Sequence, residues 1–304
     1  MRNSFVDRLL ELAKKDNNIM LLTGDLGFGV LEKFATEIPN QYLNCGVAEQ
    51  NMTAIASGLA LEGKVPFTYS IGNFPTLRCL EHIRNDVAYH DLPVKIVCIG
   101  GGFSYGQLGM SHHATEDLSI MRSIPGITVI SPADAGETVK AVLAAVHHNE
   151  SVYIRLTGGG NNPIVYEDDY EYEIGKGNIL REGNDITIIA VGTMVYNALK
   201  ASELLHEKGI STKVINMHTI KPLDKNIITN ASENTKLIVT VEEQCLSGGF
   251  GSAVLELLSD AGLSIPVKRL GLQEKYYFQN GGREYLLDQS GLATQDINRA
   301  VEEI

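Results

Sequence analysis

One carboxylate stands at a position where it could take part in acid–base chemistry. The run Asn44–Met52 reads NCGVAEQNM, and the small residues of TAIASGLA follow it. This composition predicts a helix that begins near Glu49 and packs too closely against its neighbours to admit water. Burial would favour the protonated form of the Glu49 carboxyl group, which could then hold a proton against a ligand. The alternative is a carboxylate that only stabilises the positive end of a helix, and the segment taken alone favours that alternative.

Aromatic and imidazole groups occur in two later segments. Residues 67–85 contain Phe74, and residues 100–118 have a glycine-rich start followed by His112 and His113. Glycine-rich loops at the carboxyl ends of parallel strands are places where such sheets bind ligands. Core packing is the simpler interpretation of an isolated phenylalanine, and lone histidines are mostly structural or solvated. The roles of these side chains therefore depend on the fold around them.

The elements that must position these groups follow a regular alternation. Short apolar runs that predict buried strands occur at residues 19–22, 95–99, 127–130 and 152–156, with helical periodicity between them. Alternating helices and strands predict a parallel sheet that is covered by helices. We therefore expect an α/β fold whose strand ends carry the candidate groups.

The chain divides into two predicted domains, as its length of 304 residues also suggests. Residues 1–165 hold the first alternation of helices and strands. A glycine run at 158–160 precedes the polar and acidic segment 166–184, which predicts a linker. A second alternation over residues 185–304 predicts a smaller α/β domain.

The composition argues against several classes of partner and location. Lys and Arg number 25 against 37 Asp and Glu, and the net charge of −12 disfavours nucleic acid or an anionic membrane. Four cysteines stand far apart without metal or redox spacing, which predicts buried thiols in a reducing compartment. The charged start lacks a signal peptide's apolar region, and no apolar run approaches the roughly 18 residues of a membrane span. We expect a soluble, cytoplasmic protein.

The segment around Glu49 resembles the Gly-(Val/Ile)-Ala-Glu-Gln-(His/Asn)-Met signature of transketolases and deoxyxylulose-phosphate synthases. Segments Ile220–Asp224, Val239–Glu243 and Gly248–Ala253 also resemble transketolase in order and spacing. The resemblance implies a pyrimidine-binding domain with a parallel sheet, followed by a transketolase C-terminal domain. It also implies that the cofactor is thiamine diphosphate, with protonated Glu49 hydrogen-bonded to N1′ of its pyrimidine ring. The imino tautomer favoured by that contact would take the proton from C2 of the thiazolium.

The same resemblance implies roles for four other residues. Phe74 would stack on the aminopyrimidine, and His112 would hydrogen-bond the two-carbon fragment on the cofactor. Arg155 matches an arginine that binds substrate phosphate, and its planar fork suits that group. Arg2 is a weaker match to a second such arginine, and a solvated surface arginine is the alternative. These four residues and Glu49 would form a site for a phosphorylated sugar.

The sequence lacks the motif that holds the rest of the cofactor. Thiamine-diphosphate enzymes bind the diphosphate and Mg²⁺ with Gly-Asp-Gly and an Asn roughly 25–30 residues later. The loop with Asp25 and Leu26 corresponds to one near the thiazolium, but Leu26 breaks the triplet, so we predict no metal ligand here. The resemblance therefore implies a separate N-terminal chain that carries Gly-Asp-Gly and the Asn. It further implies an α2β2 heterotetramer with the active site between chains.

The loop before His112 departs from the family pattern. Transketolases commonly have a histidine where Gly100 stands and an aspartate where Leu108 stands. In the family those two side chains contact hydroxyl groups of the sugars. We therefore expect an altered, less hydroxylated or nucleotide-linked sugar as the substrate.

The resemblance favours transfer of a two-carbon ketol unit from a ketose to an aldose. A deoxyxylulose-phosphate-synthase-like condensation and the beta subunit of a 2-oxoacid dehydrogenase are alternatives on the same scaffold. The run Ser111–Gly126 and the turn Pro132–Asp134 favour transketolase over the dehydrogenase subunit. A non-catalytic partner subunit is a further alternative. The residues at 100 and 108 support that alternative, whereas the presence of Glu49 argues against it.

Overall fold

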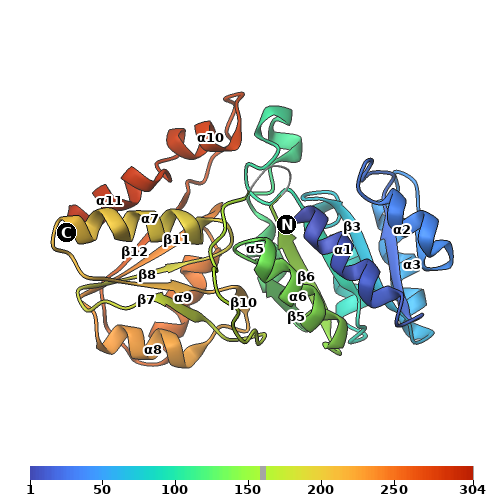
Figure 1. The fold of residues 1–304 in the computed structure, drawn as a ribbon, viewed down its shortest axis with the longest axis horizontal. Coiled ribbons are helices and arrows are strands. Elements are labelled where there is room, and N and C mark those ends of the chain that lie inside the picture. The colour runs from blue at the N-terminus through green and yellow to red at the C-terminus, as the bar shows by residue number, and fades with distance from the viewer. Residues whose placement is uncertain (158–161, 304) are drawn as a thin grey trace.

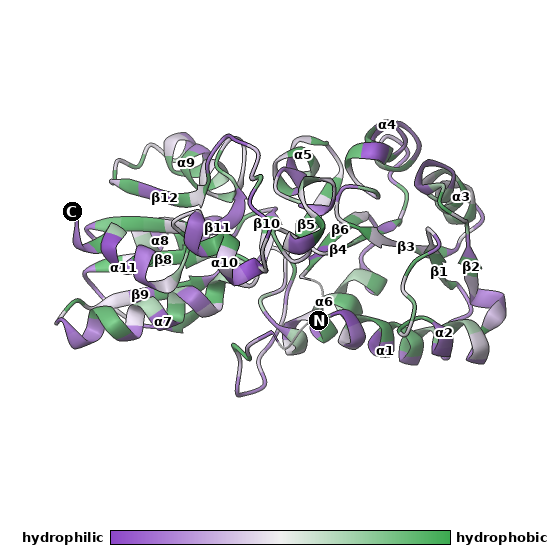
Figure 2. Cartoon of the chain, turned by 90° about the horizontal axis from the view of Figure 1, so that it is seen from above, coloured by the Kyte–Doolittle hydropathy of each residue, from purple (hydrophilic) through white to green (hydrophobic). Residues whose placement is uncertain are grey.

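Two sheets organise the chain in the computed structural model, which describes residues 1–157 and 162–303. Within these ranges, twelve strands form the two sheets, and helices lie on both faces of each sheet (Figures 1 and 2). The predicted α/β architecture is confirmed. The glycine run that precedes the predicted linker, at residues 158–160, lies outside the described residues. No helix in the described part of the chain has the length and apolar character needed to cross a membrane.

The first sheet has its strands in the order β10-β5-β6-β4-β3-β1-β2. Their bounds are β1 (Ile19–Thr23), β2 (Tyr42–Asn44), β3 (Val65–Ile71), β4 (Lys95–Ile99), β5 (Ile127–Ile130), β6 (Ser151–Leu156) and β10 (Thr219–Lys221). All neighbours pair in parallel except β10 with β5. Strands β4 and β6 are buried along their whole length, as central strands between two layers of helices must be.

Helices cover both faces of this sheet. They are α1 (Arg2–Ala13), α2 (Glu32–Glu37), α3 (Glu49–Leu61), α4 (Leu80–His82), α5 (Asp117–Ser123) and α6 (Ala135–His147), with a π-helical turn at Ile83–Ala88. Figure 2 shows α1, α2 and α6 on one face and α3, α4 and α5 on the other. The apolar stripe of α1 buries Phe5 against the ring of Tyr69 on β3, with 5.9 Å between ring centroids. Strand β3 therefore lies between two packed layers.

The second sheet has the order β12-β11-β8-β9-β7, with β7 the antiparallel strand. Its strands are β7 (Asn178–Arg181), β8 (Ile186–Ala190), β9 (Thr212–Asn216), β11 (Leu237–Cys245) and β12 (Val267–Leu272). Its helices are α7 (Met194–Glu207), α8 (Lys225–Glu233), α9 (Phe250–Asp260), α10 (Arg283–Gln289) and α11 (Thr294–Glu302). Residues of α8 and α9 belong to the same buried apolar cluster as residues of α3 and α5, so one core runs through both lobes.

Strand β10 joins the two lobes. It comes from the part of the chain predicted as the second domain, yet it completes the first sheet beside β5, and Figure 1 places it between the lobes. The predicted strands at 19–22, 95–99, 127–130 and 152–156 are confirmed as β1, β4, β5 and β6. The sequence pattern missed β2, β3 and β10. Strands β2 and β10 have three residues each and are too short to show a periodicity.

Candidate active site

Glu49 is the first residue of α3, and it is 1% exposed. The helix places small residues, Ala56 and Ser57, against the sheet, which lets it approach closely. On the other side, a β-carbon added to Gly24 would lie 3.2 Å from Cγ of Glu49. The glycine after β1 therefore leaves just enough room for the carboxylate. The prediction that Glu49 is buried at a helix start is confirmed.

Arg78 contacts both Glu49 and Phe74, a position that was not predicted from the sequence. Its Nη1 donates a hydrogen bond to Oε2 of Glu49 at 2.5 Å. The Cζ of the same guanidinium lies 4.7 Å from the centroid of the Phe74 ring. The Arg78 side chain stays 44% exposed, so one face of this cluster is open. A cation four residues after the candidate aromatic residue was the signal in the sequence.

His112 lies beside Phe74, as expected of residues that serve one site. It ends a short 3₁₀ turn, Met110–His112, and its ring centroid is 5.4 Å from that of Phe74, with the ring planes at 71°. Its Nδ1 is 3.0 Å from the hydroxyl of Ser111. The pKa of His112 is lowered below its ordinary value. Partial burial is the larger cause, and the neighbouring His113 is the smaller one. The imidazole is therefore uncharged at neutral pH and can donate one hydrogen bond and accept another.

His113 has a structural position. It is 3% exposed, its Nε2 lies 3.3 Å from the carbonyl of Gly106, and its ring meets Phe103 edge to face. These contacts fold the loop back on itself. The second histidine thereby fixes the backbone that presents His112.

Asp25 and Leu26 follow β1 in the loop that begins at Gly24, beside Glu49. Asp25 has a left-handed conformation with φ of 57°, and its carboxylate accepts a hydrogen bond from the Asn44 amide at 2.9 Å. The Leu26 carbonyl accepts a hydrogen bond from Thr23, and its side chain packs onto the core below. Their contact with a thiazolium stays a prediction.

Arg155 lies in β6 among buried polar partners. Its side chain is buried, with Nε donating to Asp117 at 2.8 Å and Nη2 donating to the carbonyls of Ala114 and Glu243 at 2.8 and 2.9 Å. Asp117 also accepts the hydroxyl hydrogen of Tyr153 at 2.6 Å. These contacts engage Nε and Nη2 of the guanidinium, and the binding of a substrate phosphate by Arg155 stays a prediction. Arg155 also ties the first lobe to β11 of the second.

Arg2 lies beside Tyr105 and Tyr69. Burial raises the pKa of the Tyr105 hydroxyl, and the nearby Arg2 guanidinium opposes that rise. The Nε of Arg2 has no hydrogen-bond partner among the described residues. Arg2 is thus a half-buried cation with donor capacity left on the first lobe, which suits the predicted contact with an anionic group better than the position of Arg155 does.

The cluster forms at the carboxyl ends of neighbouring parallel strands. Gly24 follows β1, the Phe74 segment follows β3 and the His112 loop follows β4, and these strands are adjacent in the sheet. This edge is where open α/β sheets bind ligands. No group of three His, Cys, Asp or Glu side chains within residues 1–157 and 162–303 has a metal-binding arrangement.

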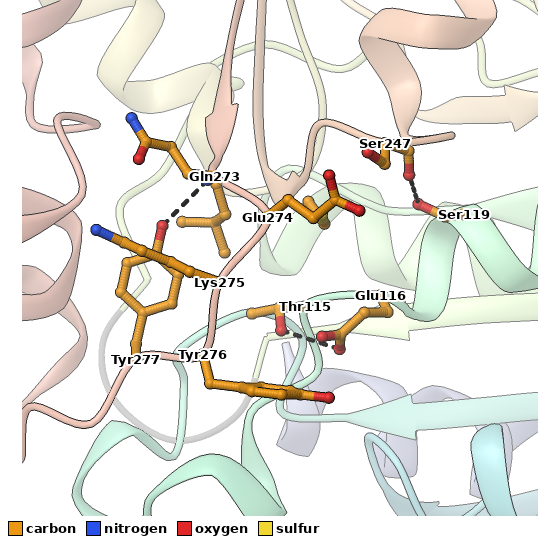
Figure 3. A pocket seen from close by; sticks show the side chains of 11 residues that line it. Thr115, Glu116, Ser119, Ser247, Gln273, Glu274, Lys275, Tyr276 and Tyr277 are labelled. Atoms are coloured by element: carbon orange, nitrogen blue, oxygen red, sulfur yellow. Dashed lines mark hydrogen bonds between the residues drawn. The ribbon is translucent and has the colours of Figure 1, made fainter.

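A pocket of about 400 Å³ lies elsewhere, between the two lobes. Figure 3 shows its lining by Thr115, Glu116 and Ser119 from one lobe and by Ser247 and residues 273–277 from the other. The hydroxyl of Tyr277 accepts a hydrogen bond from the backbone of Gln273 at 3.1 Å across its rim. None of the residues predicted for the active site lines this pocket.

Comparison with known proteins gives a consistent result. Residues 1–159 match the transketolase pyrimidine binding domain, and residues 175–297 match the transketolase C-terminal domain. The chain is 41% identical over 297 residues to one of the subunits of apulose-4-phosphate transketolase from Phocaeicola vulgatus, covering 96% of this chain and 94% of that protein. It is 38% identical over 305 residues to a 6-deoxy-6-sulfo-D-fructose transketolase subunit of Clostridium sp. (strain MSTE9), covering 100% and 94%.

A solved structure is similar over the whole length. It is described as a split gene transketolase in an inactive β4 tetramer, and it superposes with a TM-score of 0.90 at 36% identity. The match covers 99% of this chain and 96% of that one. The resemblance inferred from the Glu49 signature is confirmed: the chain belongs to the transketolase family.

Proposed function

We propose that this chain is the C-terminal subunit of a thiamine-diphosphate-dependent transketolase. The enzyme would transfer a two-carbon ketol unit from a ketose to an aldehyde acceptor. The observation that carries the proposal is the buried Glu49 carboxylate next to the Phe74 ring at the ligand-binding edge of the sheet. The similar proteins that are named as transketolase subunits support it, since the match spans nearly their full length.

The residues present fit the aminopyrimidine of the cofactor. The guanidinium of Arg78 is a flat nitrogen-bearing group that donates to Glu49 and lies over Phe74. An aminopyrimidine is flat as well and needs the same two partners, a carboxyl group at its ring edge and an aromatic surface at its face. Arg78 is half-exposed and can move aside. The Glu49 carboxyl group and the Phe74 ring therefore suit a ligand with the shape and polarity that the family implies.

Each residue then has a distinct task. Bound thiamine diphosphate supplies a nucleophilic carbon that takes up the ketol unit. Glu49 holds a proton against N1′ of the pyrimidine, and burial keeps water from competing for that contact. Phe74 orients the ring. The uncharged His112 offers a hydrogen bond to an oxygen of the two-carbon unit.

The cofactor's diphosphate and Mg²⁺ would be held mainly by a partner chain. The sequence has no Gly-Asp-Gly motif. Large apolar side chains near the proposed site are exposed, among them Val47 at 75%, Leu108 at 56% and Met110 at 49%, and such surfaces commonly mark protein interfaces. The description of the solved relative as an inactive tetramer of β chains also supports a required partner. We propose an α2β2 heterotetramer that acts in the cytoplasm.

The donor would be an anionic ketose. The names of two relatives specify a phosphorylated sugar and a sulfonated sugar, and Arg2 is the cation that we propose to bind such a group. We also propose the domain division into residues 1–165, a linker at 166–184, and residues 185–304. The matched ranges 1–159 and 175–297 support it.

Reconstitution tests the proposed function. The chain is purified alone and together with an N-terminal partner carrying Gly-Asp-Gly, and each sample receives thiamine diphosphate and Mg²⁺. Transfer from xylulose 5-phosphate, apulose 4-phosphate and 6-deoxy-6-sulfofructose to an aldehyde is then measured. We expect activity only in the mixture and only with the cofactor. Turnover by the chain alone, or a mixture inert toward every donor, would contradict the proposal.

A further inference from the structure

In the loop that follows β4, the ring of Tyr105 lies where a side chain at position 100 would be. Gly100 has a φ of 90°, and a β-carbon added to it would lie 2.3 Å from Cε2 and 2.4 Å from Cδ2 of Tyr105. Contacts this short are not tolerated between carbon atoms. The ring of Tyr105 therefore fills the volume that any side chain at position 100 would need. The missing histidine at this position is thus replaced by an aromatic ring that comes from five residues further along the loop.

Tyr105, His112 and Phe74 together form a wall of rings. The ring centroid of Tyr105 lies 6.5 Å from that of His112, with the ring planes at 81°, and His112 in turn meets Phe74. At the other end, the guanidinium of Arg2 lies close enough to interact with the Tyr105 hydroxyl. The half-buried ring is therefore a neighbour both of the histidine proposed to bind the two-carbon unit and of the arginine proposed to bind the anionic group.

We propose that Tyr105 is a specificity-determining residue that contacts the donor between its reacting carbonyl and its anionic end. The inference rests on the proposed function, since it assumes a donor that spans from His112 to Arg2. An aromatic ring offers C–H groups of a sugar an apolar surface, whereas an imidazole would hydrogen-bond hydroxyl groups. Gly100 makes this possible by leaving the space open. The wall selects donors whose middle carbons present few hydroxyl groups to it.

The test compares two donors in the complex with the N-terminal partner. One donor is the ketose phosphate or sulfonate that the wild-type complex uses best, and the other is hydroxypyruvate, which carries the same two-carbon unit without a sugar tail. Tyr105→Ala is expected to lower kcat/KM about tenfold for the ketose and less than about twofold for hydroxypyruvate. Tyr105→Phe keeps the ring and removes the hydroxyl group. If the ring alone makes the contact, this variant keeps the wild-type preference for the ketose.

A second variant tests the coupling of the two positions. Gly100→Ala should push the ring out of place and reproduce the selective loss for the ketose. The double variant with Tyr105→Ala should lose no more than Tyr105→Ala alone, because the two changes act on one contact. Gly109→Ala is the matched control for backbone strain, since Gly109 has a φ of 78° in the same loop but no atom within 4 Å of an added β-carbon. It should leave the ratio of the two donors unchanged.

The outcomes separate this inference from the function on which it rests. Equal losses with both donors in Tyr105→Ala, or an unchanged ratio, overturn the role of Tyr105 while transketolase activity stands. A wild-type complex that turns over neither hydroxypyruvate nor any ketose overturns the proposed function, and the inference falls with it. Melting temperatures of all variants show whether a loss comes from unfolding, which would lower both activities together.

Discussion

Two arginine–carboxylate pairs in the first lobe are alike in their hydrogen bond and in their place at a helix start, but they differ in exposure to solvent. Glu49 is the first residue of α3, and Asp117 is the first residue of α5. Each carboxylate accepts a hydrogen bond from an arginine, Arg78 at 2.5 Å and Arg155 at 2.8 Å. The side chain of Arg155 is 6% exposed, whereas that of Arg78 is 44% exposed.

The difference lies in what else each pair contacts. Arg155 also donates to two backbone carbonyls, one of them on β11, and Asp117 also accepts from Tyr153, so several buried partners hold that pair. Arg78 has the Phe74 ring on one side and solvent on the other. Solvent reaches the Arg78 side of the first pair, whereas both side chains of the second pair are buried. Exposure, rather than residue type, separates the pair proposed for function from the buried pair.

Glu49→Gln is expected to have the largest effect on activity. An amide cannot hold an acidic proton against the cofactor, so kcat of the reconstituted complex should fall by a factor of about 10²–10⁴. The free energy of unfolding should change far less, which urea denaturation of the same variant checks. Glu81→Gln is the control, because Glu81 is exposed on the neighbouring turn. Full activity of Glu49→Gln would refute the assignment of the active site.

Arg155→Met should produce the largest loss of stability. Removing the guanidinium leaves the Asp117 charge buried without its partner, which typically costs about 3–5 kcal/mol. Urea denaturation monitored by circular dichroism measures the change. If the variant keeps its stability and instead raises KM for a phosphorylated donor, then Arg155 binds phosphate, as the resemblance to the family implies.

Glu137 differs from the two carboxylates that are paired with arginines. It is a buried carboxyl group whose side-chain hydrogen bonds come from neutral donors, Tyr170 at 2.7 Å and Asn216 at 2.8 Å. Burial raises the pKa of Glu137 to about 7, against an ordinary value of 4.5. The folded state therefore holds a proton that the unfolded state releases between these values. The stabilising contribution is complete below pH 4.5 and is lost as the pH rises through about 7.

This pH dependence can be measured against Glu137→Gln, which does not titrate. Between pH 5 and 7 the wild type should lose on the order of 2–3 kcal/mol relative to the variant. Urea denaturation at intervals of half a pH unit gives both curves. Parallel curves would mean that Glu137 does not change its protonation over this range.

Arg78→Met should have the smallest effect on stability. Because Arg78 is 44% exposed, solvent can replace it beside Glu49, and the free energy of unfolding should fall by less than it does after Arg155→Met. The measurement is the same urea titration used for Arg155→Met, which makes the two variants directly comparable. A loss as large as that of Arg155→Met would erase the distinction between the half-exposed pair and the buried one.

Much of the site could be predicted from local sequence. Glu49, Phe74 and His112 come together because each follows a strand of one parallel sheet, and parallel strands end at the same edge. Arg78 and Tyr105 belong to the same two segments as Phe74 and His112, but their roles depend on which neighbour each side chain meets. Arg155 was placed correctly at the end of a strand, yet its side chain turns inward, and no periodicity reports that direction.

The sequence by itself therefore determined the family, the α/β alternation and the carboxylate at the start of α3, because these are encoded in short runs of neighbouring residues. Tertiary structure alone decided that β10 crosses to the first sheet, that Arg155 is sealed by the second lobe, and that Tyr105 fills the space beside Gly100. Each of these depends on which groups meet in space after folding. Burial and packing, which no single segment contains, set that outcome.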